Sequence, residues 1–416
     1  MNTENSQKSQ DFWRPQTLRC QLGPAILGSG MSEDYAAPSE LSPSSRLVSL
    51  DVFRGFIMFW IIGGEAIAHS LAKLKNLQSP AFETVIGQLE HVEWEGFRFY
   101  DLIFPSFVFI VGTSIVYSLS KSSASGDRKA ATIRVIKRGL LLWLIGIIYY
   151  GGISKGFYDA GQHEGVRLLG VLQRIGICYL VAGLMFLYLP VRGLVASFVG
   201  ILVGYWLLLA FVPVPGQATV SFAEGKNLTN WFDSQYLPFF KWKVTHDPEG
   251  ILSTLPAIGT CLLGVFAGLL LKSDRRSKGA KCLILIAAGA ALVGLGYLWG
   301  MKFPVIKNIW TSSFVLMAGG WSLVLLGVFY AVVDLIGWKG WALPFVWIGM
   351  NPIAIYLLDS VISFEGIAAR VLGGPVAEWM NAITPGLGQV VISFAGMILV
   401  LLLCRTLYRN QMFFRI

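Results

Sequence analysis

The chain has 416 residues, of which 55% are hydrophobic and only 14% are charged, and its mean hydropathy is +0.62. This average excludes an ordinary soluble domain, because a solvated surface must be built from polar residues. The net charge of +9 would indicate nucleic-acid binding in a soluble protein. In a membrane protein it is explained by basic cytoplasmic loops, so we expect no nucleic-acid partner.

The sequence divides into a polar tail and an apolar body. Residues 1–45 are rich in Ser, Pro and Gln and contain no long apolar run, which predicts a disordered cytoplasmic tail rather than a signal peptide. Residues 46–416 contain apolar runs of about 20 residues, the length that crosses a bilayer. We therefore predict an all-α polytopic membrane domain with ten transmembrane helices, at residues 50–70, 101–120, 136–152, 168–189, 193–213, 252–272, 281–300, 312–336, 341–361 and 387–406.

Ten spans place both termini on the same side, and the basic residues indicate which side. The tail and the loops on that side hold 21 of the 33 Lys and Arg, whereas the opposite loops hold 11. Because cytoplasmic loops carry the excess of Lys and Arg, both termini are predicted to be cytoplasmic. The apolar stretch 363–374 is short and holds Glu365 and Arg370, so we interpret it as a re-entrant or interfacial piece.

No metal site is expected from the cysteines. They show no CxxC pair or other ligand spacing, and four of the five lie in or beside apolar segments, which is typical of small core residues. The five are Cys20, Cys178, Cys261, Cys282 and Cys404.

Charged residues within the first predicted helix are candidates for a functional site. Asp51 and Arg54 are three residues apart on one helical face, so they form either an interfacial ion pair or, through Arg54, a site for an anionic ligand such as phosphate. Glu65 follows Gly63 and Gly64 near the outer end of the helix. A lone carboxylate at that depth must be protonated or paired, which favours a position facing a site.

The segment LEHVEWEGFRFYD gathers a histidine and several carboxylates just before the second helix. His91 can act as a general base near neutral pH, or it can be a surface histidine among solvated glutamates. Asp101 can orient that imidazole, or it can simply cap the helix that it begins.

Three further segments carry candidate polar or interfacial residues. Arg174 in GVLQRIGICYL either snorkels at the membrane edge or binds a phosphate or carboxylate. The segment KNIWTSSF is typical of an interfacial tryptophan followed by hydroxyls that cap a helix. Asn351 and Pro352 interrupt the ninth helix, which indicates either a kink or backbone exposed to a cavity.

Taken together, these motifs resemble the transmembrane acetyltransferases related to heparan-α-glucosaminide N-acetyltransferase. The matching segments occur in order, as RLVSLDVFRGF, HVEWEGFRFYDLIFPSFVFIVGTSI, GVLQRIGICYL and FPVIKNIWTSSFVLMAGGWSLVLLGVFY. The resemblance covers residues 46–360. LDxFRG or LQRIG alone is a weak pattern, whereas the ordered set with a histidine shortly before the DLxFPxFxFxxG helix is specific.

The resemblance implies a reaction that composition does not show. Enzymes of this family use cytosolic acetyl-CoA to acetylate the terminal glucosamine amine of a glycan across the membrane. It assigns the family's catalytic histidine to His91 and its aspartate to Asp101. Whether the histidine carries the acetyl group or acts as a general base stays open. Eukaryotic members have an asparagine where this chain has Glu65, so the acceptor stays open too.

The resemblance also implies partners and a location. The phosphates of acetyl-CoA would be held by Arg54 and Arg138, with Arg174 as a further candidate, and Asp101 or Glu65 would orient the histidine. The luminal domain of the eukaryotic enzymes finds no match. We therefore expect a bacterial relative in the inner membrane, acting on a cell-envelope or scavenged sugar, and a homodimer as the family suggests.

A function of another class uses the same residues. Glu65 and His91 could form the proton relay of a secondary transporter for a sugar-like solute, and a non-catalytic scaffold is a third reading. The chain shows no convincing internal repeat of the kind that such transporters have, which counts against transport.

Overall fold

The computed structural model describes residues 47–74, 79–124, 127–152 and 165–414. Helices dominate these ranges, whose only bridge between extended segments joins Glu95 to Ile306. Eight helices in the described ranges are long and apolar enough to span a bilayer, and there are nine if one bent pair forms a single span. The prediction of an all-α polytopic membrane protein is confirmed, and the predicted tail 1–45 lies outside the described residues.

The first span contains a change of helix type. Helix α2 (Val48–Phe59) continues through a π-helical turn, η2 (Trp60–Gly64), into α3 (Glu65–Ala72), and a short helix α4 (Pro80–Gln88) follows. Single π-helical turns inside α-helices are frequent at functional sites. Here the turn lies immediately before Glu65, so it sets the direction in which that carboxylate leaves the helix.

The central helices supply most of the spans. A 3-10 turn, η4 (Phe99–Leu102), leads into α5 (Ile103–Ala124). There follow α6 (Arg128–Tyr149), α7 (Val171–Tyr188), α8 (Val191–Phe211), α9 (Leu228–Tyr236), α10 (Thr254–Lys272), α11 (Lys278–Gly300), α12 (Ser312–Tyr330) and the π-helical turn η6 (Ala331–Leu335).

One predicted span differs from the described helix. The stretch 136–152 falls in α6, which starts earlier, at Arg128, and is not among the eight spans counted above. Its first half carries Arg128, Lys129, Arg134, Lys137 and Arg138. Charged side chains are costly in hydrocarbon, so this half of α6 is suited to the membrane–water interface rather than to the hydrocarbon core.

The C-terminal helices include the break predicted at the ninth span. The turn η7 (Gly340–Ala342) precedes α13 (Leu343–Met350), and α14 (Pro352–Val361) follows at an angle of 70°. Asn351 lies at the break, where its side chain donates to the Met412 carbonyl and accepts from the Phe414 amide. The short helices α15 (Phe364–Leu372) and α16 (Pro375–Ile383) precede the long helix α17 (Leu387–Arg409).

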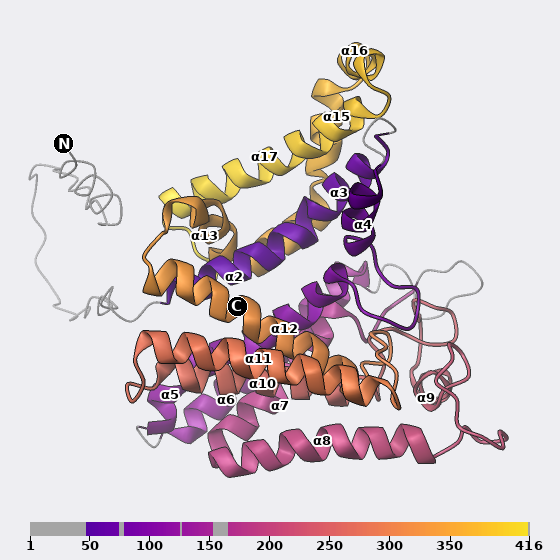
Figure 1. Ribbon diagram of the computed structural model, residues 1–416, viewed down its shortest axis with the longest axis vertical. Coiled ribbons are helices and arrows are strands. Elements are labelled where there is room, and N and C mark those ends of the chain that lie inside the picture. The colour runs from indigo at the N-terminus through magenta and orange to yellow at the C-terminus, as the bar shows by residue number, and fades with distance from the viewer. Residues whose placement is uncertain (1–46, 75–78, 125–126, 153–164, 415–416) are drawn as a thin grey trace, which may run out of the picture. The chain divides into compact units, whose positions relative to one another are not determined.

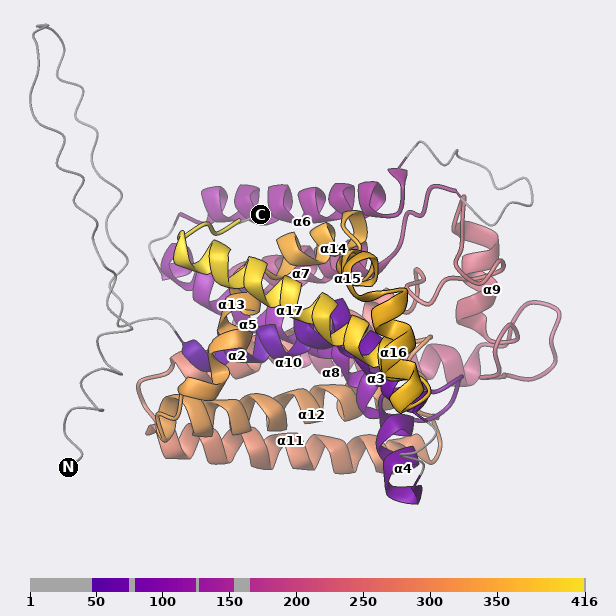
Figure 2. The same ribbon diagram turned by 90° about the horizontal axis from the view of Figure 1, so that it is seen from above.

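Small residues let the central helices approach closely. A Cβ added at Gly112 of α5 would lie 1.9 Å from the Cys261 carbonyl oxygen of α10, and one added at Gly264 would lie 1.8 Å from the Phe109 carbonyl oxygen. Between helices in a membrane there is no hydrophobic driving force, so association depends on close van der Waals packing, which small residues allow. Figures 1 and 2 show α15 and α16 at the same end of the bundle as α3 and α4, the end that carries the candidate site.

Candidate active site

His91 is held by a buried carboxylate. Its Nδ1 atom lies 2.8 Å from Oδ1 of Asp101, whose side chain is 1% exposed, whereas the His91 side chain is 50% exposed. Oδ2 of Asp101 accepts hydrogen bonds from the backbone amides of Arg98 (3.1 Å) and Val92 (3.3 Å). One oxygen of Asp101 therefore fixes the loop that carries His91, and the other faces the imidazole.

Asp101 thus combines both roles considered from the sequence. It is the third residue of η4, where its side chain satisfies the amide of the N-cap residue Arg98. The same carboxylate contacts His91, because the loop folds back over the start of the helix. A carboxylate on Nδ1 favours the tautomer that carries the proton there, which makes Nε2 the accepting nitrogen of the ring.

Lys307 completes this arrangement from a distant part of the chain. Its Nζ atom lies 3.3 Å from Oδ1 of Asp101, 2.9 Å from Nδ1 of His91 and 3.4 Å from Nε2 of His91. When Nδ1 donates to Asp101, it has no lone pair left for Lys307, and the lysine then bonds to the same carboxylate oxygen. Burial lowers the pKa of Lys307 below its ordinary value, and the charge of Asp101 opposes that shift.

The loop of Lys307 is fixed by main-chain contacts. The Gly96 amide donates to the Val305 carbonyl at 2.9 Å, beside the bridge between Glu95 and Ile306. The Ile306 amide donates to the Thr311 hydroxyl, which also caps the N-terminus of α12. The hydroxyls of KNIWTSSF thus cap the helix as predicted. Sequence reasoning missed Lys307, although it lies in a segment that carried the family resemblance.

Glu65 reaches the histidine through a tyrosine. The Tyr100 hydroxyl donates to Oε2 of Glu65 at 2.7 Å, and the Tyr100 ring lies 4.7 Å from the His91 ring between centroids. Tyr100 itself is 6% exposed. We call the five residues that meet in this way the histidine cluster: Glu65, His91, Tyr100, Asp101 and Lys307. The structure therefore brings together the three residues predicted to be catalytic and adds two that were not.

The predicted phosphate-binding arginines lie outside this cluster. Arg54 is partly buried and donates to Asp51 (3.1 Å), to the Ser114 hydroxyl (3.0 Å) and to the Gly349 carbonyl (3.3 Å). Eleven residues separate it from Glu65, roughly 16 Å along a helix. Arg138 is half-buried on α6, with its guanidinium over the Tyr179 ring at 5.0 Å.

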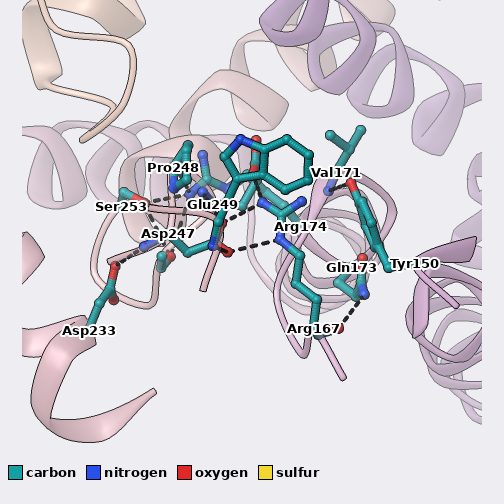
Figure 3. A network of polar contacts seen from close by, with 12 residues as sticks. Tyr150, Arg167, Val171, Gln173, Arg174, Asp233, Asp247, Pro248, Glu249 and Ser253 are labelled. Atoms are coloured by element: carbon teal, nitrogen blue, oxygen red, sulfur yellow. Dashed lines mark hydrogen bonds and ion pairs between the residues drawn. The ribbon is translucent and has the colours of Figure 1, made fainter. Parts of the chain in front are cut away.

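Arg174 occupies an enclosed scaffold position (Figure 3). It is 0% exposed and donates to the Pro248 carbonyl and the Ser253 hydroxyl, and its guanidinium stacks on Trp310 at 4.8 Å. It therefore neither snorkels at a membrane edge nor faces open space. Trp310 is 1% exposed, so the prediction of an interfacial tryptophan is wrong, because stacking on Arg174 draws the ring into the core.

A second arginine stabilises the same loop. Arg167 makes a two-bond ion pair with the buried carboxylate of Asp247, at 2.8 and 2.6 Å, and also contacts Glu249. Such bidentate hydrogen bonds are geometrically specific, so they fix loop 246–253 against the segment that precedes α7. Arg174 connects this loop to Trp310, which lies in the same segment as Lys307.

The residues of the histidine cluster are not arranged as a metal centre. The described ranges contain no group of three or more His, Cys, Asp or Glu side chains that could hold a metal ion. What the cluster offers is an imidazole whose Nδ1 contacts a buried carboxylate, with the amino group of Lys307 within 3.4 Å of both ring nitrogens. This combination suits proton transfer next to a developing negative charge.

A sequence model of the family "heparan-alpha-glucosaminide N-acetyltransferase, catalytic" matches residues 46–299. The chain belongs to this family. It is 28% identical to heparan-alpha-glucosaminide N-acetyltransferase of Mus musculus over 405 residues, and 32% identical to the Homo sapiens protein of that name over 368 residues. These alignments cover 83% and 75% of the chain but only 58% and 52% of the two relatives, so the chain spans little more than half their length.

The family match covers four of the five residues of the histidine cluster. His91, Tyr100, Asp101 and Glu65 lie inside residues 46–299, whereas Lys307 lies beyond them. The membership confirms the family resemblance drawn from the motifs.

Proposed function

We propose that this protein is an integral-membrane acetyltransferase that moves an acetyl group from cytosolic acetyl-CoA to an extracytoplasmic amino sugar or glycan. The observation that carries this proposal is the pairing of His91 with the buried carboxylate of Asp101 inside the family's catalytic region. That pairing leaves Nε2 of His91 available as a general base on the half-exposed side of the ring.

The reaction follows from these groups. Nε2 of His91 takes a proton from the acceptor amine, and the amine nitrogen attacks the thioester carbonyl carbon. The carbon–sulfur bond then breaks, and the CoA thiolate leaves and takes up the proton from the imidazolium. Asp101 stabilises the imidazolium, while the Lys307 ammonium stabilises negative charge on the thioester oxygen or the leaving sulfur.

An acetyl-histidine intermediate is the alternative order of events. In that case His91 would attack the thioester first and release CoA before the acceptor binds. Rapid quenching of the protein with labelled acetyl-CoA and no acceptor separates the two orders, because only the covalent route leaves label on His91.

The donor would enter from the cytoplasmic end. Arg54 and Arg138 are the proposed ligands for the CoA phosphates, since both are partly accessible and lie outside the histidine cluster. The enclosed position of Arg174 favours a supporting role for that residue instead. Cytoplasmic termini, a bacterial inner membrane and a homodimer stay predictions from charge distribution and family resemblance.

The test uses the full chain reconstituted in lipid vesicles, with labelled acetyl-CoA on one side and D-glucosamine on the other. We expect N-acetylglucosamine to form, and His91→Ala to reduce its formation by roughly 10²–10⁴-fold. Lys302→Met is the matched control, because Lys302 is an exposed residue of the loop that carries Lys307.

Two results would overturn the proposal. One is near wild-type acetyl transfer by His91→Ala. The other is uptake of the sugar into vesicles in the absence of CoA with no acetylated product, which is the behaviour of a transporter.

A further inference from the structure

Helix α6 carries a one-sided set of cations that the candidate site does not use. The helix contains no Asp or Glu, and its basic residues all lie in its first half: Arg128, Lys129, Arg134, Lys137 and Arg138. Four of the five are exposed, whereas Arg138 is half-buried over the Tyr179 ring of α7. In the part of the chain that the structure describes, no carboxylate pairs with any of the four exposed cations. Their charge is therefore available to an external anion.

Exposed apolar side chains continue the same face of α6 toward its C-terminus. Steps of three, four, seven and eight residues return to one side of a helix, and such steps connect six exposed residues. We call them the α6 stripe: Lys129, Ile133, Ile136, Lys137, Leu140 and Leu144. The opposite side of the helix is buried and packs against α7 and α5, and Figure 2 shows α6 along one edge of the bundle.

A tyrosine and a further cation flank the basic end of the stripe. The Tyr188 hydroxyl lies 2.8 Å from the Thr132 hydroxyl, which places the end of α7 beside the first half of α6. Tyr188 is exposed, and the exposed Arg192 follows at the start of α8. Tyrosines and basic side chains are enriched where a membrane meets water. The basic end of the stripe thus has the composition of a headgroup region, and its apolar end that of a lipid-facing surface.

We propose that the α6 stripe binds an anionic phospholipid, with Lys129 and Lys137 at the headgroup phosphate and Leu140 and Leu144 against an acyl chain. Charge complementarity selects this lipid class, because a zwitterionic headgroup has no net negative charge for these cations. The apolar half of the stripe selects a lipid over a soluble phosphate. The surface shares no residue with the histidine cluster, so this inference does not depend on the proposed function.

The preference can be measured without catalysis. The full chain is purified in detergent containing equal amounts of phosphatidylglycerol and phosphatidylcholine, and native mass spectrometry counts the lipids retained. We expect the wild type to retain phosphatidylglycerol in preference. Replacing Lys129 and Lys137 together by Gln should lower the affinity for phosphatidylglycerol roughly 10- to 30-fold. Replacing both by Arg keeps the charge, so retention should be restored, which excludes misfolding as the cause of a loss.

A second pair of cations at the same end of the bundle provides the matched control. Helices α5 and α10 run parallel, because Gly112 approaches Cys261 and Gly268 approaches Val116. The turn 273–277 that follows α10 therefore lies at the end of the bundle where α5 finishes and α6 begins.

This turn carries Arg275 and Arg276, which are both exposed. Replacing the two together by Gln removes the same charge as the lysine variant does, but leaves the α6 stripe intact. We expect this control to retain phosphatidylglycerol as the wild type does.

Four results would overturn the proposal. Equal retention of the two lipids by the wild type would remove the charge preference. An equal loss in the arginine control would assign the preference to overall charge rather than to α6. Displacement of phosphatidylglycerol by glycerol 3-phosphate would make the surface a phosphate site that needs no lipid. Unchanged retention after replacing Leu140 and Leu144 together by Ser would exclude the acyl-chain contact.

Discussion

Tyr100 joins Glu65 to the face of His91, although 35 residues separate the tyrosine from the glutamate in the sequence. Its hydroxyl donates to Glu65 while its ring contacts the imidazole. The tyrosine thus contacts both the Glu65 carboxylate and the proposed base.

Replacing Tyr100 by Phe should therefore reduce activity without unfolding the protein. The ring contact with His91 survives, but Glu65 loses a charge-assisted hydrogen bond of about 1.5–3 kcal/mol. We expect kcat/KM for glucosamine to fall roughly 10- to 100-fold while KM for acetyl-CoA stays unchanged. Steady-state kinetics on membranes check this, with Tyr297→Phe as control because Tyr297 is 63% exposed on α11.

Asp101→Asn should affect kcat most strongly. An amide of the same shape no longer stabilises the imidazolium and no longer fixes the proton on Nδ1, so we expect a loss of roughly 10²–10⁴-fold. The measurement is the rate of product formation at saturating concentrations of both substrates. A loss below threefold would show that Asp101 only shapes the loop through the amides of Arg98 and Val92.

Lys307 should set the alkaline limit of activity. Since burial lowers its pKa, its ammonium is lost at a lower pH than the ordinary lysine value of about 10.4. Activity that needs this positive charge should fall as pH rises through that lowered pKa. In Lys307→Arg the charge persists, so the alkaline arm of the kcat/KM profile should move to higher pH. An unmoved arm, with Lys302→Arg as control, would exclude Lys307 as its source.

The ion pair between Arg167 and Asp247 should contribute to the stability of the fold. Arg167→Met leaves the Asp247 carboxylate, which is 0% exposed, buried without its partner, and breaking such pairs costs about 3–5 kcal/mol. We expect a clear decrease in Tm in detergent. Lys243→Met, which removes an exposed pair with Glu224, should change stability by about 1 kcal/mol or less. Equal shifts for the two variants would contradict this account.

The fold was largely predictable because long apolar runs report membrane spans directly. The break at Asn351 and Pro352 was equally visible, since proline cannot continue the backbone ladder of a helix. The closeness of His91 and Asp101 was suggested by their position around the start of one helix. These are local features, for which neighbouring residues carry the information.

Lys307 was missed and Arg174 was misjudged for the opposite reason. The carboxylate that Lys307 contacts lies 206 residues earlier, and the contact depends on a bridge between Glu95 and Ile306 that no local pattern shows. Hydropathy shows that a buried arginine is costly, but not which groups offset the cost. For Arg174 these are a carbonyl and a hydroxyl 74 and 79 residues later, and an indole ring further on.

The separation between Asp101 and Lys307 also has a consequence for biosynthesis. At a synthesis rate of about 5–20 residues per second, the lysine leaves the ribosome roughly 10–40 s after the aspartate. Throughout that interval the nascent chain holds His91 and Asp101 without the lysine that contacts them both. The histidine cluster is therefore complete only after α11 has been synthesised, and a chain that stalls before residue 307 lacks the lysine that contacts His91 and Asp101.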